Sequence, residues 1–218
     1  MKNFIAKMGA VLLTIGAALT LSGCGEDSGT NADNRNGSNF GAGEKMVDPR
    51  DGQTYKIITI GTQTWMAENL NYQTAGSMCY DNNPDYCQKY GRLYTWHDAM
   101  NACPSGWHLP SKEEFETLLY SVGGDDIAGT ALMSRSGWDD DGNGTDKFGF
   151  GALPAGCFYN PRSEFEFEGR KGRAFFWSSM EFDGDSHAYG LELNYRHAYA
   201  DMDHTDRDSG YSVRCVKN

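Results

Sequence analysis

The sequence predicts an α+β fold with two short helices, antiparallel strands and long loops, stabilised by disulfides. Its 218 residues include 13% aromatic residues and 27 glycines but 6 prolines, a mixture typical of a loop-rich α+β domain rather than a helical bundle. Residues 94–119 carry two successive helix patterns. Six cysteines in a chain with an export signal indicate disulfides rather than metal ligands. The length suits one domain, or at most two small ones.

The charge of the chain excludes some classes of partner. The formal net charge is −11 at pH 7. Nucleic acids and anionic bilayers attract proteins through basic patches. We therefore expect no nucleic-acid partner and no direct electrostatic binding to an anionic membrane surface.

Residues 1–23 have the pattern of a bacterial lipoprotein signal peptide. Lys2 and Lys7 form a positive start, and residues 8–21 form an apolar run too short to span a bilayer comfortably. Leu21-Ser22-Gly23-Cys24 resembles a lipobox, which implies cleavage before Cys24 and acylation of Cys24, palmitate included. The alternative is an ordinary secretory signal with a cysteine at this position.

An acylated Cys24 would make the membrane a partner through a lipid anchor. We expect the protein in the cell envelope, at the outer membrane because Gly25 rather than Asp follows the cysteine, and surface-exposed if Glu26-Asp27 acts as a display signal. Residues 24–45 are rich in Gly, Asn, Ser and Asp, which predicts a flexible tether. A single domain is expected over residues 46–218.

The domain is expected to begin with a hairpin and a small disulfide loop. Residues 48–52 are turn residues, and Thr54–Ile60 and residues 64–69 predict two strands. Cys79 and Cys87 bracket an Asn-Asn-Pro-Asp turn. A local disulfide between them would contribute about 2.5 kcal/mol in the chain-entropy model; two free thiols are the alternative.

The first helix of residues 94–119 is expected to begin after Thr95, a candidate cap. Its apolar face follows the i, i+3, i+4, i+7 pattern: Trp96, Ala99, Met100 and Cys103.

The second helix is expected to begin with a capping box formed by Ser111 and Glu114. Gly123-Gly124 is expected to end it. The same spacing predicts its apolar face: Phe115, Leu118, Leu119 and Val122.

Three long motifs carry a family resemblance: DPRDGQTYKIITIGTQTWMAENLNY from residue 48, YGRLYTWHDAMNACPSGWHLPS from residue 90, and GYSVRCVKN at the C-terminus. They resemble the Fibrobacter succinogenes major paralogous domain over nearly all of residues 48–218. The resemblance implies an exported, often lipid-anchored protein, and it implies no established activity.

The order of Trp, Cys, Gly, His and Leu in residues 95–119 also resembles the C-type lectin-like fold. That resemblance implies a disulfide between Cys103 and Cys215, because in that fold a helix cysteine pairs with one in the last strand. The bridge would be worth about 4–5 kcal/mol in the chain-entropy model. Residues 106–111 resemble the formylglycine-generating enzyme group of the same fold, but His108 is expected to be a hydrogen-bonded turn residue rather than a catalytic one.

Residues 139–144 match the first half of a calcium loop. Asp139, Asp141 and Asn143 would supply oxygens at positions 1, 3 and 5, but Phe150 occupies position 12, where the loop needs a bidentate Glu. Calcium is therefore a possible cofactor if Asp146 or a distant carboxylate completes the site. A solvated turn is the alternative.

The remaining half is expected to be loop-rich. With Cys24 acylated, Cys157 is left unpaired, and we expect a buried thiol. Residues 174–179 and His187–Asn194 predict strands, whereas residues 195–208 predict a solvated acidic loop.

We expect a non-catalytic binding module for a carbohydrate or another surface ligand, such as a polysaccharide or a surface protein. Aromatic side chains in the loop-rich half are candidates for stacking on sugar rings: Trp138, Tyr159, Tyr189, Tyr195 and Tyr199. A structural or adhesion protein of the envelope is the alternative. An enzyme of the formylglycine-generating type is disfavoured, since that chemistry needs a reactive cysteine pair late in the chain, where this sequence has Cys157 and Cys215.

Overall fold

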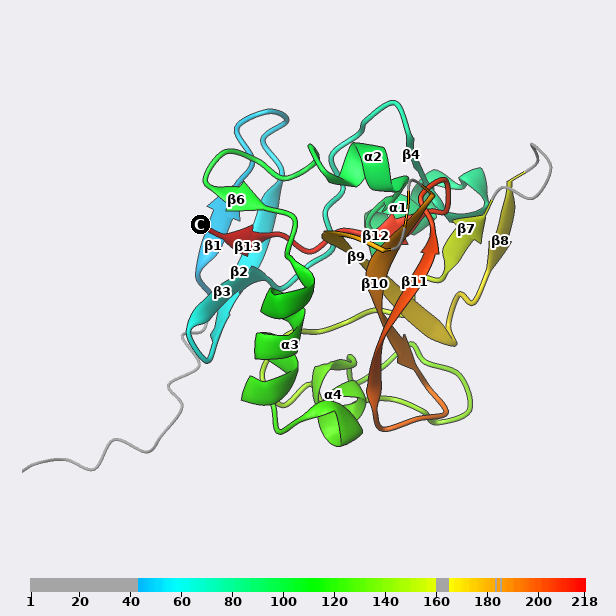
Figure 1. The fold of residues 1–218 in the computed structure, drawn as a ribbon. Coiled ribbons are helices and arrows are strands. Elements are labelled where there is room, and N and C mark those ends of the chain that lie inside the picture. The colour runs from blue at the N-terminus through cyan, green and yellow to red at the C-terminus, as the bar shows by residue number, and fades with distance from the viewer. Residues whose placement is uncertain (1–42, 160–164, 183, 185) are drawn as a thin grey trace, which may run out of the picture. The chain divides into compact units, whose positions relative to one another are not determined.

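The computed structural model describes residues 43–159, 165–182, 184 and 186–218 (Figure 1). The predicted signal peptide and Cys24 lie outside these residues. Among the described residues, no helix has the length and apolar character needed to cross a bilayer.

The first sheet brings the start and the end of the domain together (Figure 1). Its strand order is β1-β2-β3-β13-β6. The predicted hairpin is confirmed as β2 and β3, although β3 ends at Met66 instead of residue 69. The strands are β1 (Lys45–Val47), β2 (Thr54–Ile60), β3 (Gln63–Met66), β6 (Trp107–His108) and β13 (Val216–Lys217).

The second sheet has the order β11-β10-β9-β12-β5-β4, and β7 pairs with β8 in a separate hairpin. The β12–β9 pairing is parallel, and the other pairings of this sheet are antiparallel. The strands are β4 (Ser77–Met78), β5 (Leu93–Tyr94), β7 (Cys157–Tyr159), β8 (Glu166–Glu168), β9 (Arg173–Glu181), β10 (His187–Asn194), β11 (Ala200–Asp206) and β12 (Tyr211–Ser212).

The prediction of a solvated acidic loop is wrong for residues 200–206, which form β11. Seven residue pairs join β11 to β10 in register, from His187↔Asp206 to Leu193↔Ala200. Edge strands tolerate charged side chains because one backbone edge faces solvent. The polar composition therefore marks an edge strand and not a loop.

The described residues contain four α-helices where two were predicted. Asn83 caps the first by accepting from the Asp85 N–H at 3.0 Å, and Pro84 occupies its first turn. The fourth follows Gly124, in the half predicted to be loop-rich. The helices are α1 (Pro84–Tyr90), α2 (Trp96–Ala99), α3 (Lys112–Ser121) and α4 (Asp125–Leu132), and a 3-10 turn spans Tyr80–Asn82.

The predicted first helix of residues 94–119 is shorter than its pattern. α2 ends at Ala99, and Met100 is 42% exposed. The Thr95 hydroxyl donates to Asp98 Oδ2 at 3.2 Å and makes no backbone cap. Because α2 has no side-chain cap, its apolar spacing is not enough to extend the helix beyond a single turn.

α3 forms as predicted. The Ser111 hydroxyl accepts from the Glu114 N–H at 3.2 Å, and Glu114 Oε2 accepts from the Ser111 N–H at 2.8 Å. Phe115 is buried against Trp65, with ring centroids 5.3 Å apart. The helix thereby joins the first sheet to the main apolar core.

The structure contains both predicted disulfides, Cys79–Cys87 and Cys103–Cys215. Cys157 is free and buried, as expected. One buried charge, Arg214, was not predicted from the sequence, and its side chain is 0% exposed. Its guanidinium donates to Asn69 Oδ1 at 2.6 Å and to three backbone carbonyls: Met66, Phe150 and Gly151.

Candidate functional site

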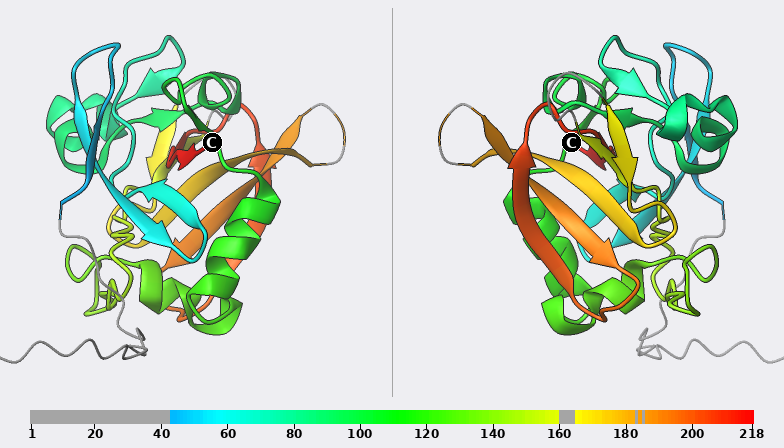
Figure 2. Two further views of the ribbon diagram at one scale, coloured as in Figure 1. Left: turned by 90° about the vertical axis from the view of Figure 1, so that its left-hand side faces the viewer. Right: turned by 90° about the vertical axis from the view of Figure 1, so that its right-hand side faces the viewer.

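One face of the β9–β11 strands is covered by helices, and the other borders a cleft. α3 contacts β9 and β10, and α4 contacts β11. Figure 2 shows α3 in front of these strands in one view and behind them in the other. The cleft has a volume of about 530 Å³ and lies between the β7–β8 hairpin and the uncovered face.

Stacked aromatic rings form the floor of the cleft. The Tyr211 ring lies 4.7 Å from Phe175 and 4.4 Å from Trp177, with interplanar angles of 20° and 27°. Gly190 makes room for this ring, since a Cβ there would lie 2.9 Å from Tyr211 Cε2. Of these rings, Phe175 and Tyr211 line the cleft and form its aromatic floor, whereas Trp177 is fully buried.

Carboxylates surround the aromatic floor. Arg173 is the single Lys or Arg among the described lining residues, and its Nε lies 3.6 Å from Glu192 Oε1. Against one cation stand five carboxylates, so the charge of the lining is −4. A cleft of this sign attracts cations and repels anions. We call it the carboxylate cleft, after its acidic lining residues: Glu168, Glu192, Asp203, Asp206 and Asp208.

The cysteine of the cleft is not an activated nucleophile. Burial, and then the nearby charge of Glu168, raise the pKa of the Cys157 thiol to about 12. Its Sγ lies 4.0 Å from Glu168 Oε1. Because the thiolate is the reactive form, a thiol that stays protonated at neutral pH is inert.

Two of the predicted aromatic residues border the uncovered face. Tyr159 lines the cleft, and its hydroxyl donates to Glu166 Oε2 at 2.6 Å, which raises the pKa of Tyr159 to about 12. Tyr199 lines a smaller hollow of about 160 Å³ that shares Glu192 with the cleft. The His197 ring stacks on Tyr199 at 4.7 Å.

The other three predicted aromatic residues lie outside the cleft lining. Trp138 is buried: it is 6% exposed, and its indole N–H donates to Ser134 Oγ at 3.0 Å. Tyr195 donates to Asp140 Oδ2 at 3.2 Å. Tyr189 packs edge-on against Phe182 at 5.2 Å.

The cleft residues that the sequence reasoning missed had a usable signal. In Arg173–Glu181, alternation places Arg173, Phe175 and Trp177 on one face. An arginine followed by two aromatics on one face marks a surface that something must cover or bind. Tyr211 gave no such signal, because β12 reaches β9 by a non-local parallel pairing.

The predicted calcium site is not assembled. Asn143 Oδ1 accepts from the Trp138 N–H at 3.1 Å, and Asp146 Oδ1 accepts from the Gly151 N–H at 2.8 Å. Asp139 Oδ1 lies 4.0 Å from Lys171 Nζ, and Asp141 has a positive φ of 57°. Throughout the part of the chain that the structure describes, no three His, Cys, Asp or Glu residues gather as a metal site. The oxygens of Asn143 and Asp146 accept local backbone hydrogen bonds instead.

His108 is a hydrogen-bonded residue, as predicted. Its Nδ1 lies 2.6 Å from Asn218 Oδ1, and its Nε2 lies 2.9 Å from Glu114 Oε1. The imidazole therefore connects α3 to the C-terminus of the chain.

Comparison with known proteins identifies the family. The family model described as the Fibrobacter succinogenes major domain matches residues 58–217. No curated protein and no solved structure matches the chain. The matched range includes β3, α3, the cysteine pair Cys103–Cys215 and all the residues of the carboxylate cleft. The chain belongs to the Fibrobacter succinogenes major domain family.

Proposed function

We propose that the protein is an exported, lipid-anchored binding module without catalytic activity, and that it binds a carbohydrate in the carboxylate cleft. The observation that carries this proposal is the aromatic floor of Tyr211 and Phe175 within a ring of carboxylates. Ligand sites in proteins commonly combine apolar walls with a few convergent polar groups.

Carbohydrate suits both parts of the cleft. A sugar presents an apolar ring face, which an aromatic ring can cover, and hydroxyl donors, which carboxylate oxygens accept. Charged acceptors make hydrogen bonds roughly twice as strong as neutral ones. The negative lining disfavours acidic sugars, so the ligand is a neutral or amine-bearing glycan.

The state of the two late cysteines, Cys157 and Cys215, supports a non-catalytic role. Cys157 is protonated at neutral pH, and Cys215 is held in a disulfide. The described residues thus supply no late pair of reactive cysteines. The C-type lectin-like fold belongs to the same proposal, and the bridge from Cys103 to the strand region at Cys215 supports it.

The lipobox supports anchoring through Cys24 at the outer membrane. Metabolic labelling with a clickable palmitate analogue tests this part. We expect label in the membrane fraction of the wild-type protein and none on Cys24→Ser. Label that persists on Cys24→Ser would contradict the anchor.

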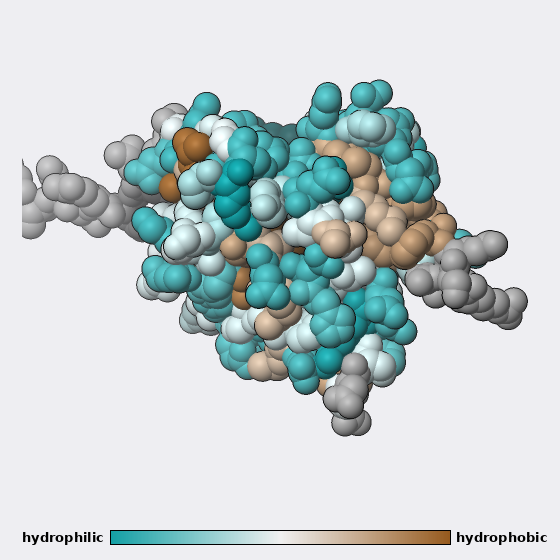
Figure 3. Space-filling view, turned by 90° about the horizontal axis from the view of Figure 1, so that it is seen from above, coloured by the Kyte–Doolittle hydropathy of each residue, from teal (hydrophilic) through white to brown (hydrophobic). Residues whose placement is uncertain are grey.

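A structural or adhesion role in the envelope is the second candidate. Phe165 is 45% exposed beside β8, and its ring lies 5.3 Å from Phe158. Figure 3 shows a mostly hydrophilic surface with a hydrophobic area on the side of α1, β7 and β8. An exposed apolar area of this kind suits a protein contact.

A glycan array distinguishes the two candidates. We expect the full-length protein to retain neutral or amine-bearing glycans and to reject uronate-bearing ones, with and without added calcium. Retention of envelope proteins alone in a parallel pull-down, with no glycan bound, would favour the structural role and overturn the proposed one.

A further inference from the structure

A second hollow lies on a part of the molecule that the carboxylate cleft does not use. It has a volume of about 480 Å³ and is bordered by the Cys79–Cys87 disulfide. An adjoining hollow of about 190 Å³ shares Gln53, Asn71 and Gln88 with it. We call the larger hollow the amide hollow, after its side-chain amides: Gln53, Asn71, Gln73 and Gln88.

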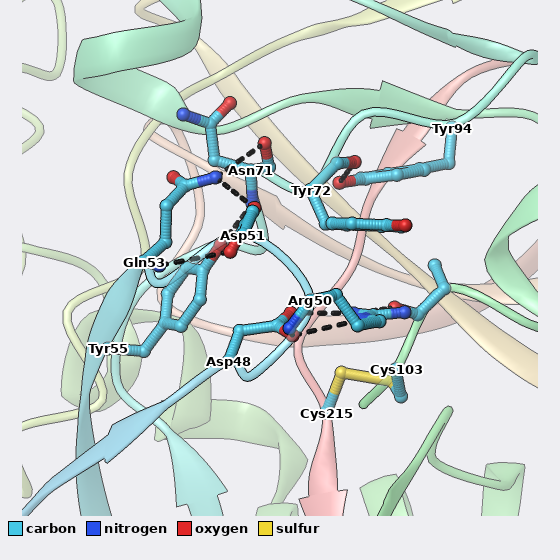
Figure 4. Close-up of polar contacts among 11 residues, drawn as sticks. Asp48, Arg50, Asp51, Gln53, Tyr55, Asn71, Tyr72, Tyr94, Cys103 and Cys215 are labelled. Atoms are coloured by element: carbon cyan, nitrogen blue, oxygen red, sulfur yellow. Dashed lines mark hydrogen bonds and ion pairs between the residues drawn. A yellow bond between two sulfur atoms is a disulfide. The ribbon is translucent and has the colours of Figure 1, made fainter. Parts of the chain in front are cut away.

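One side of the amide hollow is held in place by the turn after β1 (Figure 4). Asp51 accepts from both the backbone N–H of Gln53, at 3.0 Å, and its side-chain amide, at 2.5 Å. The same amide donates to the Asn71 carbonyl at 3.2 Å, and the Asn71 N–H donates to the Tyr55 hydroxyl at 3.0 Å. Two segments far apart in the sequence are thereby joined at the hollow.

Tyr72, the aromatic residue of the hollow, is contacted both at its ring and at its backbone. The Arg50 guanidinium lies 3.8 Å from the centre of the Tyr72 ring, and the Tyr94 hydroxyl donates to the Tyr72 carbonyl at 2.6 Å. Arg50 is itself held by Asp48, whose carboxylate accepts from Nε at 2.9 Å and from Nη2 at 2.7 Å. Such preorganisation reduces the entropy lost on binding.

Several polar groups of the amide hollow are left for a ligand. Gln53 uses its amide N–H groups, which leaves its carbonyl oxygen. Gln73 accepts from Arg92 Nη2 at 3.0 Å, which leaves its N–H groups. Gln88 lies exposed on α1, and the hydrogen bonds among described residues do not include its side chain.

The carboxylate cleft and the amide hollow differ in charge. Asp51 and Arg92 are the charged residues among those described around the amide hollow, and their charges cancel. An amide both donates and accepts, as a hydroxyl does, whereas a carboxylate only accepts. A neutral, amide-lined surface beside an ordered aromatic ring therefore matches an uncharged, hydroxyl-rich ligand.

We propose that the amide hollow is a second binding site, for a neutral sugar residue, separate from the carboxylate cleft. It extends the proposed function, because a protein with two sites of different charge can engage two kinds of glycan unit. It stands on its own observations, so failure of the cleft proposal leaves it testable.

Nuclear magnetic resonance of the full-length protein in detergent micelles tests the site. The probe is the neutral oligosaccharide that gives the strongest array signal, or maltotetraose if the array gives none. We expect titration to shift the side-chain amide signals of Gln73 and Gln88. Titration that leaves both signals unmoved up to about 10 mM probe, tenfold above a millimolar dissociation constant, overturns the proposal.

Variants separate the amide hollow from the cleft. We expect Gln73→Ala and Gln88→Ala each to weaken binding of the neutral probe about three- to tenfold, the effect of one lost hydrogen bond. Asn101→Ala removes another exposed side-chain amide, outside the hollow, and is expected to leave affinity unchanged. Shifts at Gln73 and Gln88 that persist in Glu192→Gln show independence from the cleft. Equal affinity of Gln73→Ala, Gln88→Ala and Asn101→Ala for the neutral probe would overturn the proposal of a second site.

Discussion

The Tyr211 ring lies against the Trp177 indole, with ring centroids 4.4 Å apart and planes inclined by 27°. The indole is fully buried, and its N–H donates to the Tyr94 carbonyl at 2.7 Å. The floor of the carboxylate cleft is thus continuous with the core between β9 and β5. Mutations of the Tyr211 side chain should therefore change both the free energy of unfolding and the affinity for a ligand in the cleft.

Tyr211→Ala should destabilise the protein by about 3 kcal/mol, because it removes a large ring packed on two aromatic residues. Tyr211→Phe keeps the ring and should stay within about 1 kcal/mol of wild type. Urea unfolding followed by tryptophan fluorescence measures both. An equal loss in the two variants would show that the hydroxyl, and not the ring, holds the floor.

Arg214 should be essential for stability. Burial lowers the pKa of Arg214 to about 9, so the guanidinium is still charged at pH 7. Its four acceptors cannot be satisfied by an apolar side chain. We expect Arg214→Met to cost about 3–5 kcal/mol.

Arg135→Met is the matched control for Arg214→Met, since Arg135 is exposed and donates to a single carbonyl. Its cost should be about 0.5 kcal/mol or less. Thermal unfolding at pH 7 compares the two variants. Similar melting temperatures would contradict the structural role of Arg214.

Cys157 should make stability fall at alkaline pH. Its folded-state pKa is raised from 9.0 to about 12, so the unfolded chain loses the thiol proton first. Its stabilisation is present below pH 9 and declines as the pH rises toward 12, by at most about 1.4 kcal/mol per pH unit.

Cys157→Ala removes this titration and should give a flatter stability curve between pH 9 and 11. Burial also raises the pKa of Tyr55 and of Tyr94, but both tyrosines are common to the two proteins, so the difference between the curves reports the thiol. Urea unfolding at half-unit steps of pH provides the measurement. Parallel curves would show that Cys157 is accessible in the folded protein.

The Cys103–Cys215 disulfide closes a loop with a sequence separation of 112 residues. Replacing both cysteines by Ala should cost about 4–5 kcal/mol in the chain-entropy model, against about 2.5 kcal/mol for the Cys79–Cys87 pair. Chemical unfolding under non-reducing conditions measures the loss of stability for each pair. A larger loss from the short loop would indicate that native-state packing outweighs chain entropy here.

The parts of the fold that were predicted correctly carry local signals. The capping box at Ser111 and the apolar spacing from Phe115 predicted α3. The β2–β3 hairpin followed from a β-rich run over Thr54–Ile60, a short turn and a second run over residues 64–69. α1 had an equally clear signal in Asn83-Pro84, but the turn residues between the two cysteines were interpreted as a loop.

The parts that were missed depend on distant segments. β11 is a strand because β10 pairs with it, and its acidic composition gives no hint of that partner. Arg214 is buried because carbonyls from two distant segments, at residues 66 and 150–151, converge on it. The cleft likewise combines residues of the six strands β7 to β12, so its aromatic floor could not be assembled from spacing alone.

Isothermal titration of an amine-bearing glycan into the full-length protein tests the central claim most directly. Glu192→Gln and Asp203→Asn each remove one charge of the carboxylate cleft and should weaken binding about tenfold, as expected for a charge-assisted hydrogen bond. Glu113→Gln removes an exposed carboxylate of α3 and should bind as wild type does. Equal affinity in all three variants would contradict the assignment of the cleft as the binding site.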